Sequence, residues 1–133
     1  GLPVDRNLIR EAGLWERGTG AAAMRALLES GTRYDAVFAM NDALAIGCLH
    51  ALHEAGRSIP EDVAVIGFDD IDDAAFTSPT LSTISPGREQ IAEQAVELLA
   101  TRIENRVDGT DEPDRFVRVD ADFEVIARES TGS

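Results

Sequence analysis

Two short apolar segments, each followed at once by polar residues, most constrain the fold of this chain. Residues 35–40 (DAVFAM) run into an Asn-Asp pair, and residues 63–68 (VAVIGF) run into an Asp-Asp pair. Nearly continuous apolar runs of this length are typical of strands that are covered on both faces in a parallel sheet. We therefore expect two buried parallel strands with polar side chains directly after each.

Predicted helices alternate with these strands. Residues 18–30 carry apolar side chains at helical spacing, with Thr19 placed to cap the start and Gly31 to end the helix. Residues 43–55, between the two strands, and residues 88–105 are predicted to be helical as well. Because helix and strand alternate with short links, the sequence predicts an α/β fold, a parallel sheet flanked by helices with right-handed crossovers.

The C-terminal part of the chain adds shorter elements. Residues 80–85 predict a further strand, and residues 108–114 form a polar linker that contains Gly and Pro. Residues 116–119 and 123–126 are predicted to be terminal strands, and residues 128–133 a tail.

Two of the predicted helices need cover for their apolar surfaces. The 43–55 helix is apolar around most of its circumference, so it requires a second cover from its own domain or from a partner subunit. The 88–105 helix is amphipathic, and its apolar stripe consists of Ile91, Ala95, Leu98, Leu99 and Ile103.

Composition limits the classes of function. The chain has 133 residues, about one domain, and its 25 acidic and 12 basic residues give a formal net charge of −13. Every basic residue is Arg, and a surface this acidic repels nucleic acid. The single cysteine, Cys48, permits no internal disulfide. We find neither a membrane-length apolar run nor a secretion signal, and expect a soluble, cytoplasmic protein.

The polar residues after the two strands are the candidate ligand-binding residues. In open parallel sheets ligands bind beyond the carboxyl ends of the strands, so Asn41 and Asp69 would lie at one edge of the sheet. Amide and carboxylate oxygens accept hydrogen bonds and the amide also donates, which suits the hydroxyls of a sugar or a ring nitrogen. The alternative is that such residues only cap helices or begin turns. We favour that alternative for Asp42 and Asp70, and both interpretations stay open for Asn41 and Asp69.

Several motifs resemble the sensor domain of LacI/GalR transcriptional repressors. Residues 36–47 (AVFAMNDALAIG) continue through residues 51–56 (ALHEAG) to residues 59–70 (IPEDVAVIGFDD), and the Asn-Asp and Gly-Phe-Asp-Asp elements at this separation are specific markers. The other matching segments are an aromatic residue followed by a helix start (residues 15–24), a crossover (81–86, LSTISP) and a closing segment (123–131, FEVIAREST).

This resemblance implies a two-lobed fold of the periplasmic-binding-protein type (type I), present here incompletely. Residues 1–79 would form the second lobe, residues 80–107 a crossover strand and helix of the first lobe, and residues 108–133 a linker and terminal strands. The family's DNA-binding headpiece and most of its first lobe are not among these residues. Since this leaves the stripe of the 88–105 helix uncovered, we expect a homodimer or a larger assembly.

The resemblance also implies a function. A small-molecule effector, a carbohydrate in our interpretation, would bind between the lobes and control DNA binding by the headpiece. Asn41 and Asp69 match the positions that hydrogen-bond the effector, and Trp15 matches an aromatic residue that can stack on a sugar face. Without the resemblance, Trp15 would be an ordinary core or surface aromatic residue. Pro86 stands where many members of the family carry a cleft Gln, so that polar contact is absent.

Two other functions are compatible with parts of the sequence. A sugar-binding protein of an ABC transporter would share the fold and the cleft chemistry. The acidic run Asp69, Asp70, Asp72 and Asp73 could hold magnesium in a phosphoryl-transfer domain, but the chain has neither a Lys nor a phosphate-binding Gly-x-x-x-x-Gly-Lys motif. The sequence offers no catalytic nucleophile, and we expect no enzyme activity, no cofactor and no metal site.

Overall fold

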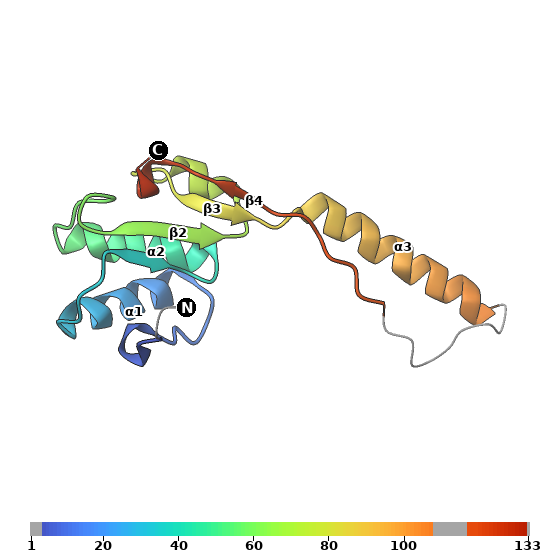
Figure 1. Ribbon diagram of the computed structural model, residues 1–133, viewed down its shortest axis with the longest axis horizontal. Helices are drawn as coiled ribbons and strands as arrows, with labels where there is room; N and C mark the ends of the chain where they lie inside the picture. The colour runs from blue at the N-terminus through green and yellow to red at the C-terminus, as the bar shows by residue number, and fades with distance from the viewer. Residues whose placement is uncertain (1–3, 108–116, 133) are drawn as a thin grey trace. The chain divides into compact units, whose positions relative to one another are not determined.

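The computed structural model describes residues 4–107 and 117–132 (Figure 1). The chain divides into two compact units, and each is described by itself. Unit 1 comprises the residues up to Ser85 together with those from Val125 onward, and unit 2 comprises Pro86–Glu124. The assignment of residues 1–79, 80–107 and 108–133 to lobes of a larger fold stays a prediction.

A four-stranded sheet forms the centre of unit 1. Its strands are β1 (Ala36–Phe38), β2 (Ala64–Phe68), β3 (Ser82–Ser85) and β4 (Glu124–Ile126), in the order β1-β2-β3-β4. β1 pairs with β2 and β2 with β3, both in parallel, which confirms the predicted parallel arrangement for these three strands. β4 runs in the opposite direction in Figure 1, so the complete sheet is mixed.

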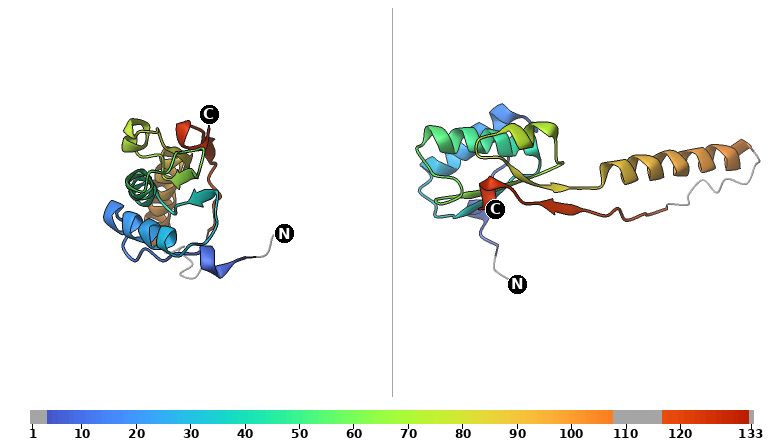
Figure 2. Two further views of the ribbon diagram at one scale, coloured as in Figure 1. Left: turned by 90° about the vertical axis from the view of Figure 1, so that its left-hand side faces the viewer. Right: turned by 90° about the horizontal axis from the view of Figure 1, so that it is seen from above.

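Helices α1 (Arg17–Glu29) and α2 (Asp42–Glu54) lie on the same side of the sheet (Figure 2). α2 packs on β2 and α1 packs on α2. The second cover that the apolar circumference of α2 requires is therefore α1, within the same unit. The side chains buried between these elements include Met24, Leu44, Cys48, Leu49 and Leu52.

The start of α1 differs from the prediction. Its N-cap is Glu16, one turn before Thr19. Thr19 instead takes part in a capping box, in which its hydroxyl group accepts a hydrogen bond from the Glu16 N–H at 3.3 Å. The same hydroxyl donates to the carbonyl of Leu14, which ties the preceding loop to the helix. Gly31 ends the helical segment at φ +68°, as predicted.

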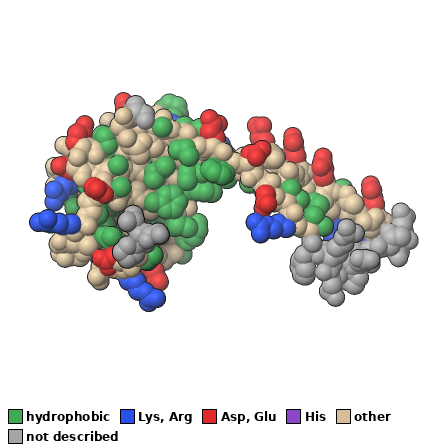
Figure 3. Space-filling view, in the orientation of Figure 1, with side chains coloured by type: hydrophobic (Ala, Val, Ile, Leu, Met, Phe, Trp, Pro, Cys, Tyr) green, Lys and Arg blue, Asp and Glu red, His purple; other side chains and the backbone are tan. Residues whose placement is uncertain are grey.

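The second face of the sheet is less covered than the apolar runs predicted. Along β2, Val65 is fully buried, whereas the residues on either side of it are only half-buried. Phe38 of β1 is 53% exposed and Met40, just beyond, is 59% exposed. Hydrophobic side chains gather on one face of unit 1 in Figure 3. The prediction of cover on both faces is wrong for the residues that the structure describes, because α1 and α2 lie on one face only.

Residues 128–133 were predicted to be a tail, but the described residues of this segment are anchored to the sheet. Ser130 lies in the short 3-10 helix η3 (Glu129–Thr131) and is fully buried. Its hydroxyl donates to the carbonyl of Val65 at 2.6 Å and accepts from the Ser82 N–H at 2.8 Å. One side chain near the C-terminus therefore joins β2 and β3.

Two more short 3-10 helices, η1 (Arg6–Leu8) and η2 (Asp72–Phe76), lie in unit 1. Unit 2 contains α3 (Arg88–Val107), none of whose residues is buried. The predicted strand at 116–119 is wrong for Val117–Val119, which form no strand, and Phe116 lies outside the described residues. Within the described parts of the chain, no helix is both long and apolar enough to cross a membrane.

Candidate ligand-binding rim at the carboxyl edge of the sheet

The sheet register brings the two predicted ligand residues to the same edge. Phe38 of β1 pairs with Ile66 of β2, and the Ala39 N–H continues the ladder to the Ile66 carbonyl at 2.9 Å. Asn41 follows Phe38 by three residues, and Asp69 follows Ile66 by three residues. The two positions are therefore matched at the carboxyl ends of neighbouring parallel strands, where α/β proteins bind ligands.

Asn41 is the N-cap of α2. Its Oδ1 accepts a hydrogen bond from the Leu44 N–H at 2.8 Å, which satisfies one of the free amides of the first helical turn. Its Nδ2 donates to the Trp15 carbonyl at 3.4 Å. This contact places the loop that carries Trp15 beside the edge, and the Trp15 side chain is 61% exposed. We call Trp15, Asn41 and Asp69 together the rim.

The backbone after β2 is unusual at Asp69 and Asp70. Both have positive φ, +106° and +52°, a region in which residues other than Gly are strained by about 1–2 kcal/mol each. Asp69 donates its N–H to the Ile84 carbonyl at 3.0 Å, and Asp70 donates its N–H to the Thr83 hydroxyl at 3.3 Å. Neighbouring strand β3 thus holds the strained turn in place, and Asp69 is half-buried.

Two carboxylates of the acidic run after β2, those of Asp70 and Asp73, have structural partners. Asp70 Oδ1 accepts from Arg128 Nη2 at 2.9 Å, in a pair whose side chains are 25% and 21% exposed. Arg128 also donates from Nη1 to the Leu81 carbonyl at 2.7 Å. Asp73 pairs with Arg17 at the start of α1. Among the described residues no group of three or more His, Cys, Asp or Glu side chains could hold a metal ion.

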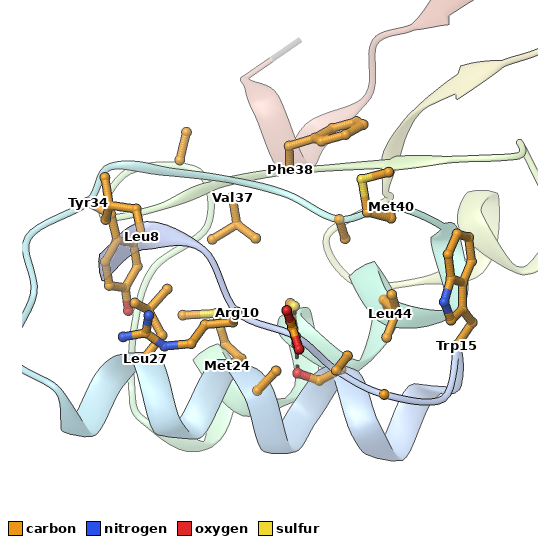
Figure 4. Close-up of a pocket in the computed structure, with 18 of the residues that line it drawn as sticks. Leu8, Arg10, Trp15, Met24, Leu27, Tyr34, Val37, Phe38, Met40 and Leu44 are labelled. Atoms are coloured by element: carbon orange, nitrogen blue, oxygen red, sulfur yellow. Dashed lines mark hydrogen bonds between the residues drawn. The ribbon is translucent and has the colours of Figure 1, made fainter. Parts of the chain in front are cut away.

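A cavity of unit 1 lies beside Trp15 of the rim. It has a volume of about 900 Å³ and separates the N-terminal segment from β1 and α1 (Figure 4). Its walls are mainly apolar, and its lining includes Leu8, Met24, Leu27, Val37 and Phe38. Trp15 and Met40 line one end of the cavity, whereas Asn41 and Asp69 do not contribute to it. The rim and the cavity therefore share Trp15, whereas the two polar residues of the rim lie outside the cavity lining.

Comparison with known proteins identifies the family. A model of the periplasmic binding protein-like domain matches residues 1–131. The chain belongs to the periplasmic binding protein-like domain family. It is 45% identical to the HTH-type transcriptional regulator AscG of Escherichia coli (strain K12) over 94 residues. These residues make up 70% of this chain and 28% of AscG. The chain is 36% identical over 121 residues to the HTH-type transcriptional repressor PurR of Haemophilus influenzae (strain PittEE), 91% of the chain and 35% of PurR.

Solved structures show the same relationship. A regulator of the LacI family from Sanguibacter keddieii DSM 10542 matches with a TM-score of 0.88 and 45% identity, over 99% of this chain and 47% of that one. The CelR regulator in complex with cellobiose matches with a TM-score of 0.84 and 32% identity, over 97% of this chain and 37% of the CelR chain. A LacI-family regulator from Arthrobacter sp. FB24 in complex with lactose matches with a TM-score of 0.72 and 32% identity, over 88% of this chain and 42% of that regulator.

These relatives confirm the resemblance to LacI-type regulators and the incomplete periplasmic-binding-protein-like fold. The chain spans about a third of the length of the curated relatives, and it corresponds to part of their effector-binding domain. The curated relatives described above are named as transcriptional regulators.

The structure adds residues that sequence reasoning did not single out. Asp42, which we interpreted as a cap or turn residue, is fully buried, and its Oδ1 accepts from the Thr83 hydroxyl at 2.6 Å. Thr83 itself is fully buried in β3. The sequence did not distinguish Thr83, because three of the four residues of β3 carry a hydroxyl group.

Proposed function

We propose that this chain is the part of a LacI-type regulator that binds a sugar effector, and that Asn41, Asp69 and Trp15 contact the sugar. The observation that carries the proposal is the matched position of Asn41 and Asp69 beyond the Phe38–Ile66 pair. Two solved relatives are complexes with cellobiose and with lactose, which supports a carbohydrate as the class of ligand.

The chemistry of the rim suits a sugar. Asp69 offers a carboxylate that can accept hydrogen bonds from two hydroxyls, and the amide of Asn41 offers a donor. The exposed ring of Trp15 offers an apolar surface for the C–H face of a pyranose. A strained backbone at Asp69 is typical of ligand-binding positions, because surrounding contacts must hold it.

DNA binding would be performed outside these 133 residues. The net charge of −13 disfavours duplex DNA, because the chain as a whole repels the phosphates. The effector would control DNA binding by preferring one arrangement of the lobes over the other, since a ligand shifts an equilibrium only by its difference in affinity for the two states. The protein is proposed to act in the cytoplasm.

The test is sugar titration of the natural gene product by calorimetry, beginning with cellobiose and lactose and extending to common mono- and disaccharides. Asp69→Ala is expected to weaken binding at least tenfold, because the carboxylate that accepts hydroxyl hydrogen bonds is lost. Asp72→Ala removes an equal charge three residues away and is expected to leave the affinity unchanged. Undiminished binding by Asp69→Ala would remove Asp69 from the site, and the failure of every sugar to bind would overturn the ligand class.

Trp15 provides an independent optical readout. It is the only tryptophan of the chain, so the emission of the chain reports its environment directly. Sugar binding at the rim is expected to change this emission, and Trp15→Phe, which keeps an aromatic face, is expected to retain measurable affinity. An unchanged emission spectrum at saturating sugar would place the ligand elsewhere.

Self-association is the second part of the proposal. The apolar residues of α3 are largely exposed, with Val96 at 68%, Leu99 at 60% and Ile103 at 55%. Such a face is covered in a stable protein, and we expect a homodimer. Light scattering of the 133-residue chain is expected to give twice its monomer mass, and a clean monomer that binds no hydrophobic dye would contradict the expectation.

A further inference from the structure

One buried carboxyl group, that of Asp42, connects the start of α2, strand β3 and the turn after β2. Asp42 lies in the first turn of α2 and is fully buried. Its Oδ1 accepts from the hydroxyl of Thr83 in β3 at 2.6 Å, and its Oδ2 accepts from the Ile71 N–H at 2.9 Å. Asp42 directly follows Asn41, and Ile71 is two residues from Asp69. The carboxyl group thus links the two proposed sugar-binding residues to each other.

The hydroxyl of Thr83 completes this connection. It donates to Asp42 and accepts from the Asp70 N–H at 3.3 Å, so both its hydrogen-bonding functions are used inside the protein. Together, Asp42 and Thr83 bind two successive backbone amides of the turn, those of Asp70 and Ile71. A third amide, that of Asp69, is held by the Ile84 carbonyl.

The turn needs this support because of its conformation. Asp69 and Asp70 both have positive φ, and two consecutive strained residues persist only where neighbouring groups hold them. If the Asp42–Thr83 pair is lost, the turn can relax and the Asp69 carboxylate moves from its place at the rim. When one member of a buried hydrogen-bonded pair is removed, the remaining group has no hydrogen-bond partner, and this free-energy cost favours such a rearrangement.

We propose that Thr83 and Asp42 are positioning residues for the sugar site: they set the affinity by fixing Asp69, although both are fully buried and touch no ligand. This inference rests on the proposed function for its affinity readout. The observation behind it is a continuous series of bonds. Asp42, which follows Asn41 in the sequence, is hydrogen-bonded to Thr83, and both side chains are fully buried. Thr83 in turn is hydrogen-bonded to Asp70, which follows Asp69.

The primary test compares two changes at Thr83. Thr83→Val removes the hydroxyl at nearly constant shape and is expected to weaken sugar binding about tenfold in protein that circular dichroism shows to be folded. Thr83→Ser keeps the hydroxyl and is expected to restore the affinity to within threefold of wild type. The matched control is Thr77→Val, because the Thr77 hydroxyl donates only to the carbonyls of Ala74 and Pro79. It is expected to lower stability without changing the affinity.

A double variant separates positioning from general destabilisation. If Thr83 acts through Asp69, the variant Asp69→Ala/Thr83→Val is expected to bind within threefold of Asp69→Ala alone. Wild-type affinity in folded Thr83→Val, or a double variant weakened by the product of both single effects, would overturn the inference. Undiminished binding by Asp69→Ala would instead overturn the proposed function.

Hydrogen exchange tests the same inference without a ligand. In Thr83→Val the amides of residues 69–71 are expected to lose at least tenfold protection, while those of α1 keep theirs. If Thr83→Val does not fold, Asp42→Asn serves instead, since it keeps the size of the side chain and changes the Thr83 and Ile71 contacts. Unchanged protection at residues 69–71 in a folded variant would contradict the positioning role.

Discussion

Helices α1 and α2 approach each other so closely that a single methyl group is expected to separate them. A Cβ added at Gly47 would lie 2.7 Å from the Ala21 backbone nitrogen and would also clash with the Arg17 carbonyl oxygen. A Cβ added at Gly20 would lie 2.7 Å from Leu44 Cα, so the close contact exists in both directions. Ordinary contacts of this kind begin near 3.4 Å, which means that the helices must move apart by at least 0.7 Å.

The magnitude follows from two opposed effects. Gly→Ala within a helix normally gains about 1 kcal/mol in helix propensity. Overpacking of a close contact costs about 1–3 kcal/mol, and the upper end applies because the atoms met are backbone atoms that cannot rotate aside. We expect Gly47→Ala to lower the free energy of unfolding by about 2 kcal/mol, which corresponds to a fall in Tm of about 8 °C for a domain of this size.

Gly18, in the first turn of the neighbouring helix α1, provides the control for Gly47 in α2. A Cβ at Gly18 would meet no atom within 4 Å, so Gly18→Ala is expected to be neutral or to stabilise by up to about 1 kcal/mol. The measurement is urea unfolding followed by circular dichroism, with equal slopes required for the comparison. Equal stability of the two variants would refute the argument that backbone contact between α1 and α2 limits the size of residue 47.

Three further predictions concern other parts of unit 1. Ser130→Ala removes a buried hydroxyl with two backbone partners and is expected to cost about 2 kcal/mol in urea unfolding, whereas the exposed Ser58→Ala is expected to change little. Burial raises the pKa of the Cys48 thiol to about 11, so mass spectrometry should detect no alkylation by iodoacetamide at pH 8 until the protein is unfolded in urea. Hydrogen bonds from the Thr80 backbone N–H and hydroxyl lower the pKa of Glu129, so its contribution to stability is present above the ordinary glutamate pKa and is lost as the pH falls through the lowered value. The stability difference between wild type and Glu129→Gln in urea unfolding should therefore shrink on acidification, and a constant difference would contradict this assignment.

The elements with a strong local pattern were predictable. β1, β2 and α2 begin and end within two residues of the predicted bounds, because apolar periodicity and polar strand ends are properties of short stretches of chain. The matched edge positions of Asn41 and Asp69 also followed from the sequence, since parallel pairing of two adjacent strands determines them.

Contacts between distant parts of the chain were not predictable in this way. Ser130 lies 65 residues from its partner Val65, and nothing in the C-terminal sequence distinguishes a buried Ser from an exposed one. The apolar residues Val117 and Val119 were predicted to form a strand, yet they are 56% and 46% exposed and form none, because alternation does not specify a pairing partner. The Asp42–Thr83 contact likewise spans 41 residues.

The sequence left two interpretations of Asn41 open, a helix cap and a ligand contact. They are compatible, because the oxygen and the nitrogen of the amide group have different contacts. Oδ1 caps α2 through the Leu44 N–H, whereas Nδ2 lies on the side of Trp15. A cap therefore does not exclude a ligand contact, and it even orients the donor by fixing the acceptor. Asn41→Asp separates the two roles: it keeps an acceptor for the cap, so the Tm should hold, but it has no donor, so the sugar affinity should fall. A variant that loses stability and keeps its affinity would assign Asn41 to the helix alone.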